Sequence, residues 1–120
     1  MATRSHIGKK QKDGTIKYIY CHWDGYPSHN GDILKKNYNT KSKVDALLEL
    51  GDLKILDPEI HKCSAFSGDD SKARVVASFD DFHNGDVSYY YLFEKNKWRC
   101  FNSVGEEFGF LGFQNSLTYI

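Results

Sequence analysis

No stretch of this 120-residue sequence approaches the roughly 20 consecutive apolar residues that a membrane-spanning helix needs. The first ten residues, MATRSHIGKK, also lack the apolar segment of a secretory leader. Cysteine is scarce: Cys21, Cys63 and Cys100 are odd in number, far apart, and include no CxxC spacing. We therefore expect free thiols in a reducing compartment, in a soluble cytoplasmic protein with no membrane partner.

Motifs of catalysis and metal binding are missing as well. The sequence contains no GxSxG, HExxH or Walker-type loop. Cys21 and His22 are neighbours on a predicted strand, so their side chains point to opposite faces. His61 and Cys63 can share a face, but two ligands do not make a structural zinc site. We expect no metal, no cofactor and no enzymatic activity.

The formal net charge is zero, but the charges are segregated along the chain. Residues 1–43 contain nine Lys and Arg against three Asp, a net charge of +6, and the remaining 77 residues carry −6. A basic segment of this kind can attract an anionic ligand or nucleic acid. It can equally pair with the acidic part of the same fold or of a second subunit.

Two hairpins and two helices can be predicted from local patterns. Residues 3–8 and 15–23 are predicted to pair across the Asp13-Gly14 turn, with the second segment as a central strand. A short helix is expected over 31–38, capped by Asn30 or Asp32, and a longer one over 41–50, with Asn39 or Thr40 as its cap and Gly51 after its end. The second hairpin joins 86–94 to 98–103.

Other segments are shorter or ambiguous. Residues 53–56 and 73–77 are predicted as strands, and 64–72 as a loop. In 78–85, Asn84-Gly85 favours a hairpin turn, whereas the capping-box pattern of Ser78 and Asp81 favours a helical turn. We expect one α+β domain over 1–120, an antiparallel sheet with two short helices packed on one side.

Aromatic residues are frequent near the candidate ligand-binding positions. The run YIYCHWDGYPSHNGD (18–32) suggests a strand that leaves the core through a turn, with Trp23 and Tyr26 packed. The helix that follows it presents N–H groups near residues 30–32, with Lys35 and Lys36 behind them, a pattern that can cradle phosphate. An ordinary capped helix explains the same residues.

The chain resembles a family of small phage and prophage proteins in three runs: TIKYIYCHWDGYPSHNGDILKKNYNT, KVDALLELGDLKIL and YYYLFEKNKW. The resemblance covers most of residues 1–56 and 89–98. It is to the anti-Thoeris proteins, which sequester the cyclic ADP-ribose isomer made by bacterial TIR-domain enzymes, and some of which hold cyclic oligonucleotides. The resemblance implies a non-enzymatic sponge in the cytoplasm of an infected bacterium, assembled as a homo-oligomer, a dimer or higher.

A base and its phosphates can be held by an aromatic ring and an arginine. Phe82 lies beside a predicted turn, where a ring can be exposed, and Arg99 or Arg74 can contact phosphate. Phe82 can instead be a core residue and Arg99 a surface charge. The predicted ligand-binding residues are Phe82, Arg99, Arg74 and Asn84, with Lys35 and Lys36 as the alternative.

A second function is compatible with the charge distribution. The basic N-terminal part can act as the face of a protein-binding or nucleic-acid-binding phage inhibitor. Nucleic-acid binding through phosphates depends steeply on salt, whereas binding of one small dianion in a pocket depends weakly on it. The apolar C-terminal residues LTYI are expected to dock on the same fold or on another subunit.

Overall fold

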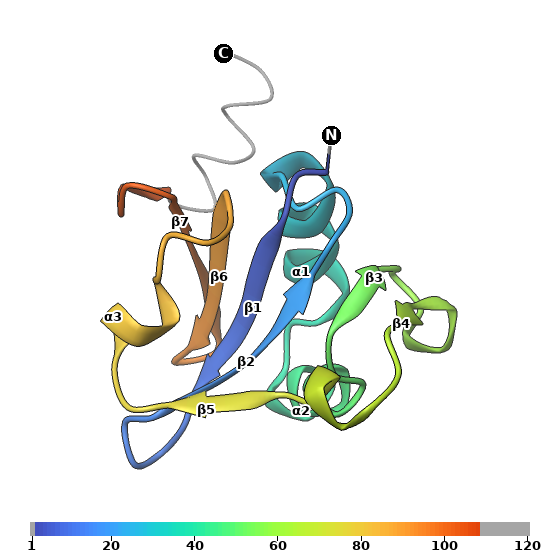
Figure 1. Cartoon of the computed structure of the whole chain (residues 1–120), viewed down its shortest axis with the longest axis horizontal. Helices are drawn as coiled ribbons and strands as arrows, with labels where there is room; N and C mark the ends of the chain where they lie inside the picture. The colour runs from blue at the N-terminus through green and yellow to red at the C-terminus, as the bar shows by residue number, and fades with distance from the viewer. Residues whose placement is uncertain (1, 109–120) are drawn as a thin grey trace.

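The computed structural model describes residues 2–108, which form one twisted eight-stranded sheet with helices on both faces (Figure 1). The sheet order is β4-β3-β2-β1-β6-β7-β8, and β5 also pairs with β2. The strands are β1 (Ser5–Lys10), β2 (Ile16–Cys21), β3 (Leu53–Ile55), β4 (Ser64–Ala65), β5 (Arg74–Val76), β6 (Tyr89–Glu94), β7 (Lys97–Asn102) and β8 (Glu107–Phe108). The predicted α+β class is confirmed.

The first hairpin forms as predicted. β1 and β2 pair antiparallel, with Lys10 opposite Ile16 and Ser5 opposite Cys21. Gly14 has a φ of +89° in the turn, a conformation that glycine adopts without steric cost. β2 contacts β1 on one side and both β3 and β5 on the other, so it is a central strand.

The sheet is mixed, and this corrects the predicted antiparallel sheet. β1 runs parallel to β6, with Ile7 opposite Tyr91, and β2 runs parallel to β3. A parallel neighbour needs a long crossover connection, and here most of the chain separates β1 from β6. Alternation within a strand determines which side chains share a face, but it does not determine which distant strand lies alongside.

The β6–β7 hairpin is predicted correctly and closes through a tight turn. Lys95 and Asn96 both have positive φ, 54° and 60°, as a type I′ turn requires at its two central positions. The register then places Phe93 opposite Trp98 and Tyr91 opposite Cys100.

Two helices cover one face of the sheet, as predicted. α1 (Asp32–Asn37) follows a π-helical turn over Pro27–Gly31, and α2 (Lys41–Glu49) is capped by Thr40, whose Oγ1 accepts from the N–H of Lys43. α1 has no side-chain cap, so the predicted cap at Asn30 or Asp32 is wrong. Asn30 is instead buried, and its amide donates to the hydroxyl of Ser5 at 3.1 Å.

The opposite face of the sheet packs against the single turn of α3 (Phe79–Phe82). The Ser78 hydroxyl accepts from the N–H of Asp81, so the helical alternative for this segment is confirmed. The core is therefore divided by the sheet. One cluster contains Leu34, Val44 and Leu47 from α1 and α2, and the other contains Phe82 with Tyr18, Tyr90 and Phe101.

The chain leaves β2 through Asp24, which has a φ of +57°, and Gly25. A Cβ on Gly25 would lie 2.9 Å from the carbonyl carbon of Arg4, so this turn packs directly against the start of β1. Trp23 and Tyr26 are 45% and 39% exposed, which corrects the prediction that both are packed. The C-terminal residues LTYI lie outside the described residues.

The three cysteines are free. Cys21 and Cys100 are buried in the core under α1 and α2, and burial raises the pKa of Cys21 to about 11. Both buried thiols are therefore protonated side chains that pack as small apolar groups.

Candidate functional site

Phe82 is fully buried, so the prediction that its ring is exposed to stack on a ligand is wrong. The ring packs edge-on against Tyr18 and Tyr90, with centroids 5.5 and 5.7 Å away. A Cβ on Gly8 would lie 2.8 Å from its Cε1, so glycine in β1 makes room for this ring. Phe82 attaches α3 to the sheet.

The alternative site at the start of α1 is not supported by its backbone. The N–H of His29 donates to Tyr26, that of Asn30 to Asp24, and that of Asp32 to the carbonyls of His29 and Pro27. The N–H groups of Asn30 and Asp32, predicted to be available for phosphate, are therefore occupied. Lys36 pairs with Asp32 at 3.6 Å. Lys35 and Lys36 line neither of the two cavities described below.

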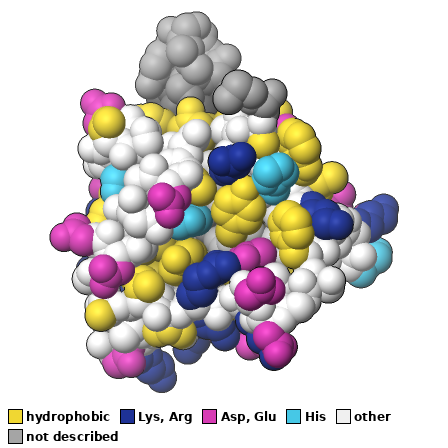
Figure 2. Space-filling model, viewed as in Figure 1, with side chains coloured by type: hydrophobic (Ala, Val, Ile, Leu, Met, Phe, Trp, Pro, Cys, Tyr) yellow, Lys and Arg dark blue, Asp and Glu magenta, His cyan; other side chains and the backbone are white. Residues whose placement is uncertain are grey.

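Arg74 and Asn84 are brought together in a cavity of about 560 Å³ on the face of the sheet that carries α3. Figure 2 shows Lys or Arg side chains on this side of the molecule, with hydrophobic and His side chains between them. We call it the arginine cavity. It is lined by Arg4, His6, Tyr18, Tyr20, Asp52, Arg74, Asn84, Asp86 and Val87.

Strand register explains why these side chains meet. Tyr18 and Tyr20 are two residues apart in β2, so their side chains point to the same face of the sheet. Tyr18 is opposite Arg74 in β5, and Tyr20 is opposite His6 in β1. Arg4 comes just before β1 and is two residues from His6, so it is expected on the same face. Arg74 is therefore level with Tyr18 and Arg4 lies beyond Tyr20, so the two arginines are about 13 Å apart along the strand direction at ~3.3 Å per residue. That span suits a ligand of nucleotide size.

Arg74 is held by a buried carboxylate. Its Nη1 and Nη2 donate to the two oxygens of Asp52 at 3.0 and 2.5 Å, and this bond is the main cause that raises the pKa of Arg74. Asp52 also accepts from the N–H of Tyr20 at 2.9 Å. The guanidinium carbon lies 5.6 Å from the centre of the Tyr18 ring, an arrangement typical of a cation–π contact.

Arg4 differs from Arg74 because no carboxylate of residues 2–108 pairs with its side chain. Its carbonyl accepts from the N–H groups of Ser88 and Tyr89, which fixes its backbone against the start of β6. The side chain is exposed at the rim of the cavity. Arg4 is therefore the guanidinium with the most capacity to take a new anionic partner.

Tyr20 and Phe66 provide ring surface on which a base could stack. The hydroxyl of Tyr20 and Nδ1 of His22 are 2.7 Å apart, and the Tyr20 ring is half-buried. A hollow of about 300 Å³ shares Tyr20 and Asp52 with the arginine cavity and adds Phe66. Burial lowers the pKa of His6, so this ring is neutral at pH 7 and adds no positive charge.

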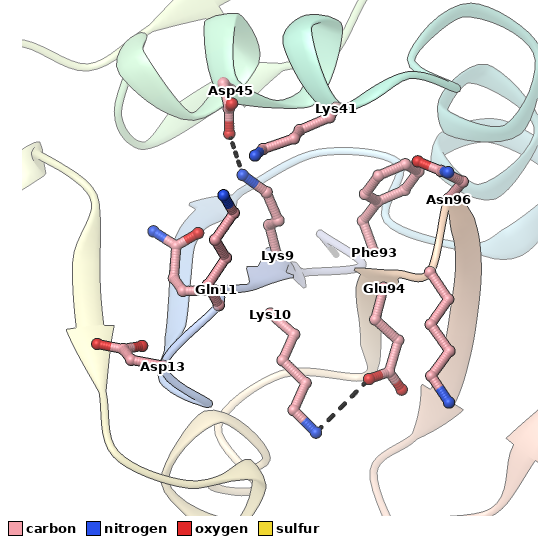
Figure 3. Close-up of a pocket in the computed structure, with 11 residues that line it drawn as sticks. Lys9, Lys10, Gln11, Asp13, Lys41, Asp45, Phe93, Glu94 and Asn96 are labelled. Atoms are coloured by element: carbon pink, nitrogen blue, oxygen red, sulfur yellow. Dashed lines mark hydrogen bonds and ion pairs between the residues drawn. The ribbon is translucent and has the colours of Figure 1, made fainter.

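A second cavity, of about 680 Å³, lies at the other end of β1 (Figure 3). We call it the lysine cavity because five lysines line it: Lys9, Lys10, Lys12, Lys41 and Lys95. They come from β1 and its turn, from α2, and from the β6–β7 turn. None of the predicted ligand-binding residues lines it.

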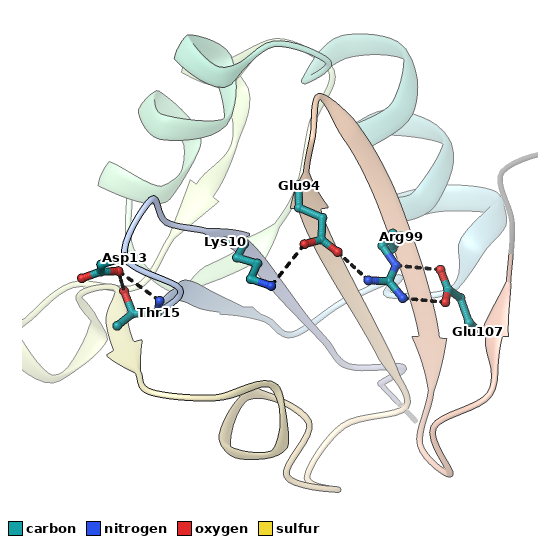
Figure 4. Close-up of polar contacts among 6 residues, drawn as sticks. All are labelled: Lys10, Asp13, Thr15, Glu94, Arg99 and Glu107. Carbon is teal, nitrogen blue, oxygen red and sulfur yellow. Dashed lines mark hydrogen bonds and ion pairs between the residues drawn. The ribbon is translucent and has the colours of Figure 1, made fainter.

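Arg99 is bound by two glutamates (Figure 4). Its Nη1 donates to Glu94, while Nε and Nη2 donate to Glu107 at 2.8 and 2.7 Å. The same contacts lower the pKa of Glu107. Lys10 completes the chain by pairing with Glu94 at 3.6 Å. Arg99 is therefore a cross-strand ion-pair residue, and the structure does not bring it to Arg74 or Asn84.

The sequence predictions missed Arg4, His6, Tyr18 and Tyr20 as site residues. The shared face of Tyr18 and Tyr20 was visible in the alternation of the second strand. Extending the hairpin register through Asp13-Gly14 would have added His6 and Arg4. The position of Asp52 had no comparable signal, because it depends on how β3 and β5 both pair with β2.

Metal ligands do not gather in the described part of the chain: among residues 2–108 no three His, Cys, Asp or Glu side chains are placed to hold one ion. Over the same residues, no helix is both long and apolar enough to span a bilayer.

Comparisons of the chain with protein-family models, with curated proteins and with solved structures find no match.

Proposed function

We propose that this protein binds and sequesters a small cyclic nucleotide signal, of the cyclic ADP-ribose type, without cleaving it. It would act as a phage anti-defence sponge in the cytoplasm of an infected bacterium. The proposal takes its ligand class from the resemblance to the anti-Thoeris proteins. The observation that carries it is the arginine cavity, where two guanidinium groups flank tyrosine rings.

The cavity provides the groups that such a ligand needs. Its volume of about 560 Å³ is within the usual range of roughly 300–1,000 Å³ for small-molecule sites. Arg4 would contact the diphosphate, and the half-buried Tyr20 ring would stack on the base. Asn84 and Asp86 would bond ribose hydroxyls. Arg74, which is held by Asp52, would keep the Tyr18 ring in place at the other end of the cavity.

Sequestration without cleavage is consistent with the chemistry of the cavity. The neutral His6 ring is enclosed by Tyr18, Phe82 and Tyr90, with centroids 4.7, 5.9 and 5.1 Å away, and its Nδ1 lies 3.1 Å from the carbonyl oxygen of Phe82. It is therefore a packed structural ring and is poorly placed to exchange protons with a ligand.

The direct test is recovery of the intact ligand. The full-length protein is mixed with the product of a TIR-domain enzyme, freed of unbound ligand and heated, and the supernatant is analysed by mass spectrometry. We expect unchanged signal molecule at a fixed ratio to protein. A hydrolysed product would indicate an enzyme, and absence of any signal would refute the binding. DNA binding that falls steeply with salt would instead support the inhibitor function.

Paired variants locate the site. Arg4→Ala should weaken ligand retention by about tenfold or more, the effect of losing one charge-assisted contact. Arg99→Ala removes a guanidinium from the same sheet face but leaves the arginine cavity intact, so it should retain the ligand. The reverse result would place the site at Arg99.

A further inference from the structure

The lysine cavity is separate from the arginine cavity and has a different lining. Three parts of the fold converge on it: the end of β1 with the turn after it, the first turns of α2, and the β6–β7 turn (Figure 3). Phe93 contributes an apolar wall, and the amides of Gln11 and Asn96 lie at its edge. The proposed binding of a ligand at the arginine cavity does not account for the lysine cavity.

The lining has an excess of positive charge. Five ammonium groups face three carboxylates, those of Asp13, Asp45 and Glu94, which leaves a formal excess of two positive charges. Each carboxylate already has a partner. Asp45 accepts from Lys9 at 2.6 Å, Glu94 is shared by Lys10 and Arg99, and Asp13 accepts from the N–H and hydroxyl of Thr15 at 3.0 and 2.6 Å.

Three lysines remain available. Lys12, Lys41 and Lys95 are exposed, and none forms an ion pair with another residue of the described range 2–108. They belong to three different elements, so their convergence is a product of the tertiary fold. Lys9 lies deeper, with its side chain only 11% exposed, and adds a fixed charge to the wall of the cavity.

We propose that the lysine cavity binds a compact polyanion, the di- or triphosphate group of a ligand. Lysine binds phosphate as a point charge, and several ammonium groups around one hollow match a group whose charges are close together. A cavity of about 680 Å³ has room for a triphosphate alone or for one attached to a nucleoside.

The test measures binding of inorganic triphosphate to the full-length protein by isothermal titration calorimetry at about 150 mM salt, where long-range surface attraction is screened. We expect saturable binding with one site per chain. The variant Lys12→Glu/Lys41→Glu should weaken it by about a hundredfold, since each substitution removes one charge-assisted contact and adds a repulsion. No binding by the unmodified protein would overturn the proposal.

A charge-matched control separates a site from general attraction. Lys62→Glu/Lys72→Glu changes the net charge equally, but both lysines are exposed and neither lines the cavity. Equal loss in both double variants would refute the site. Arg4→Ala should bind triphosphate normally, so failure at this cavity and failure at the arginine cavity are distinguishable.

Titration with ATP identifies the source of the phosphate group. If ATP and inorganic triphosphate bind equally and both need Lys12 and Lys41, the cavity recognises the polyphosphate chain alone. If ATP binds more tightly with the same lysine dependence, the nucleoside also contributes. Binding of ATP that is unaffected by Lys12→Glu/Lys41→Glu would contradict the proposal.

Discussion

Phe82 and Phe66 are the same residue type in opposite environments. Phe82, the last residue of α3, is 0% exposed, and Phe66 is 38% exposed. Truncating a buried phenylalanine removes its packing and leaves a cavity, so Phe82→Ala should lower the free energy of unfolding by about 3–5 kcal/mol. Phe66→Ala should lower it by less than about 1 kcal/mol. Urea denaturation of both variants checks this. Equal losses would contradict the burial of Phe82.

His6 links stability to pH. Burial lowers the pKa of His6. The hydrogen bond to Phe82 and the nearby carboxylates of Asp86 and Asp52 raise it, but their effect is smaller. In the unfolded chain a histidine titrates near ~6.5, so below this pH the unfolded state binds more protons than the folded state. Above about pH 6.5 His6 therefore costs the fold no stability, and the free energy of unfolding decreases as the pH falls below that value towards the lowered pKa of the folded state.

The measurement is urea unfolding at about pH 7.5 and 5.5 for the unmodified protein and for His6→Gln. The loss of unfolding free energy at the lower pH should be smaller in the variant. His61→Gln is the control, since His61 is exposed. A pH response that is the same with and without His6 would show that other groups cause it.

Among the elements, α2 depends on its first turn. The Oγ1 of Thr40 accepts from the N–H of Lys43 at 3.3 Å, the only side-chain cap found at either end of this helix. Thr40→Ala should lower the free energy of unfolding by about 0.5–2 kcal/mol. Thr40→Ser, which keeps a hydroxyl at the cap position, should change it by less than ~0.5 kcal/mol. Thermal unfolding of both variants, followed by circular dichroism, decides whether the cap contributes.

Elements defined by local signals could be predicted, and elements that depend on distant neighbours could not. Asp13-Gly14 specified the first hairpin, and Thr40 with Gly51 bounded α2. The parallel pairing of β1 with β6 had no local signal, because it joins strands about 80 residues apart. The same limit applied to the arginine cavity, where Asp52 and Arg74 meet only because β3 and β5 both flank β2.

At the scale of the whole molecule, the segregated charges meet within the fold. Lys9, Lys10 and Lys17 from the basic third pair with Asp45, Glu94 and Glu49 from the acidic remainder. The basic segment therefore pairs in part with the acidic part of the same fold, which is one of the interpretations that the sequence allowed. Among residues 2–108, Arg4, Lys12 and Lys41 have no carboxylate partner, and they line the two cavities.

The homo-oligomer stays a prediction, and a cluster of exposed rings is where we expect its interface. Single exposed rings are normal on protein surfaces, but Trp23 and Phe66 both contact His22, with ring centroids 4.8 and 6.5 Å from it. Clustered exposed rings commonly mark interaction surfaces. We expect the unmodified protein to be a dimer or higher at micromolar concentration by light scattering.

Substitutions can tell whether this surface holds the subunits together. Trp23→Lys/Phe66→Lys places two charges in the ring cluster, and burying them at an interface would be costly, so the measured mass should fall toward that of one chain. Val104→Lys is the control, since Val104 is 77% exposed and outside the cluster. An unmodified protein with the mass of a single chain would end the prediction, and an oligomer that survives the double substitution would place the interface elsewhere.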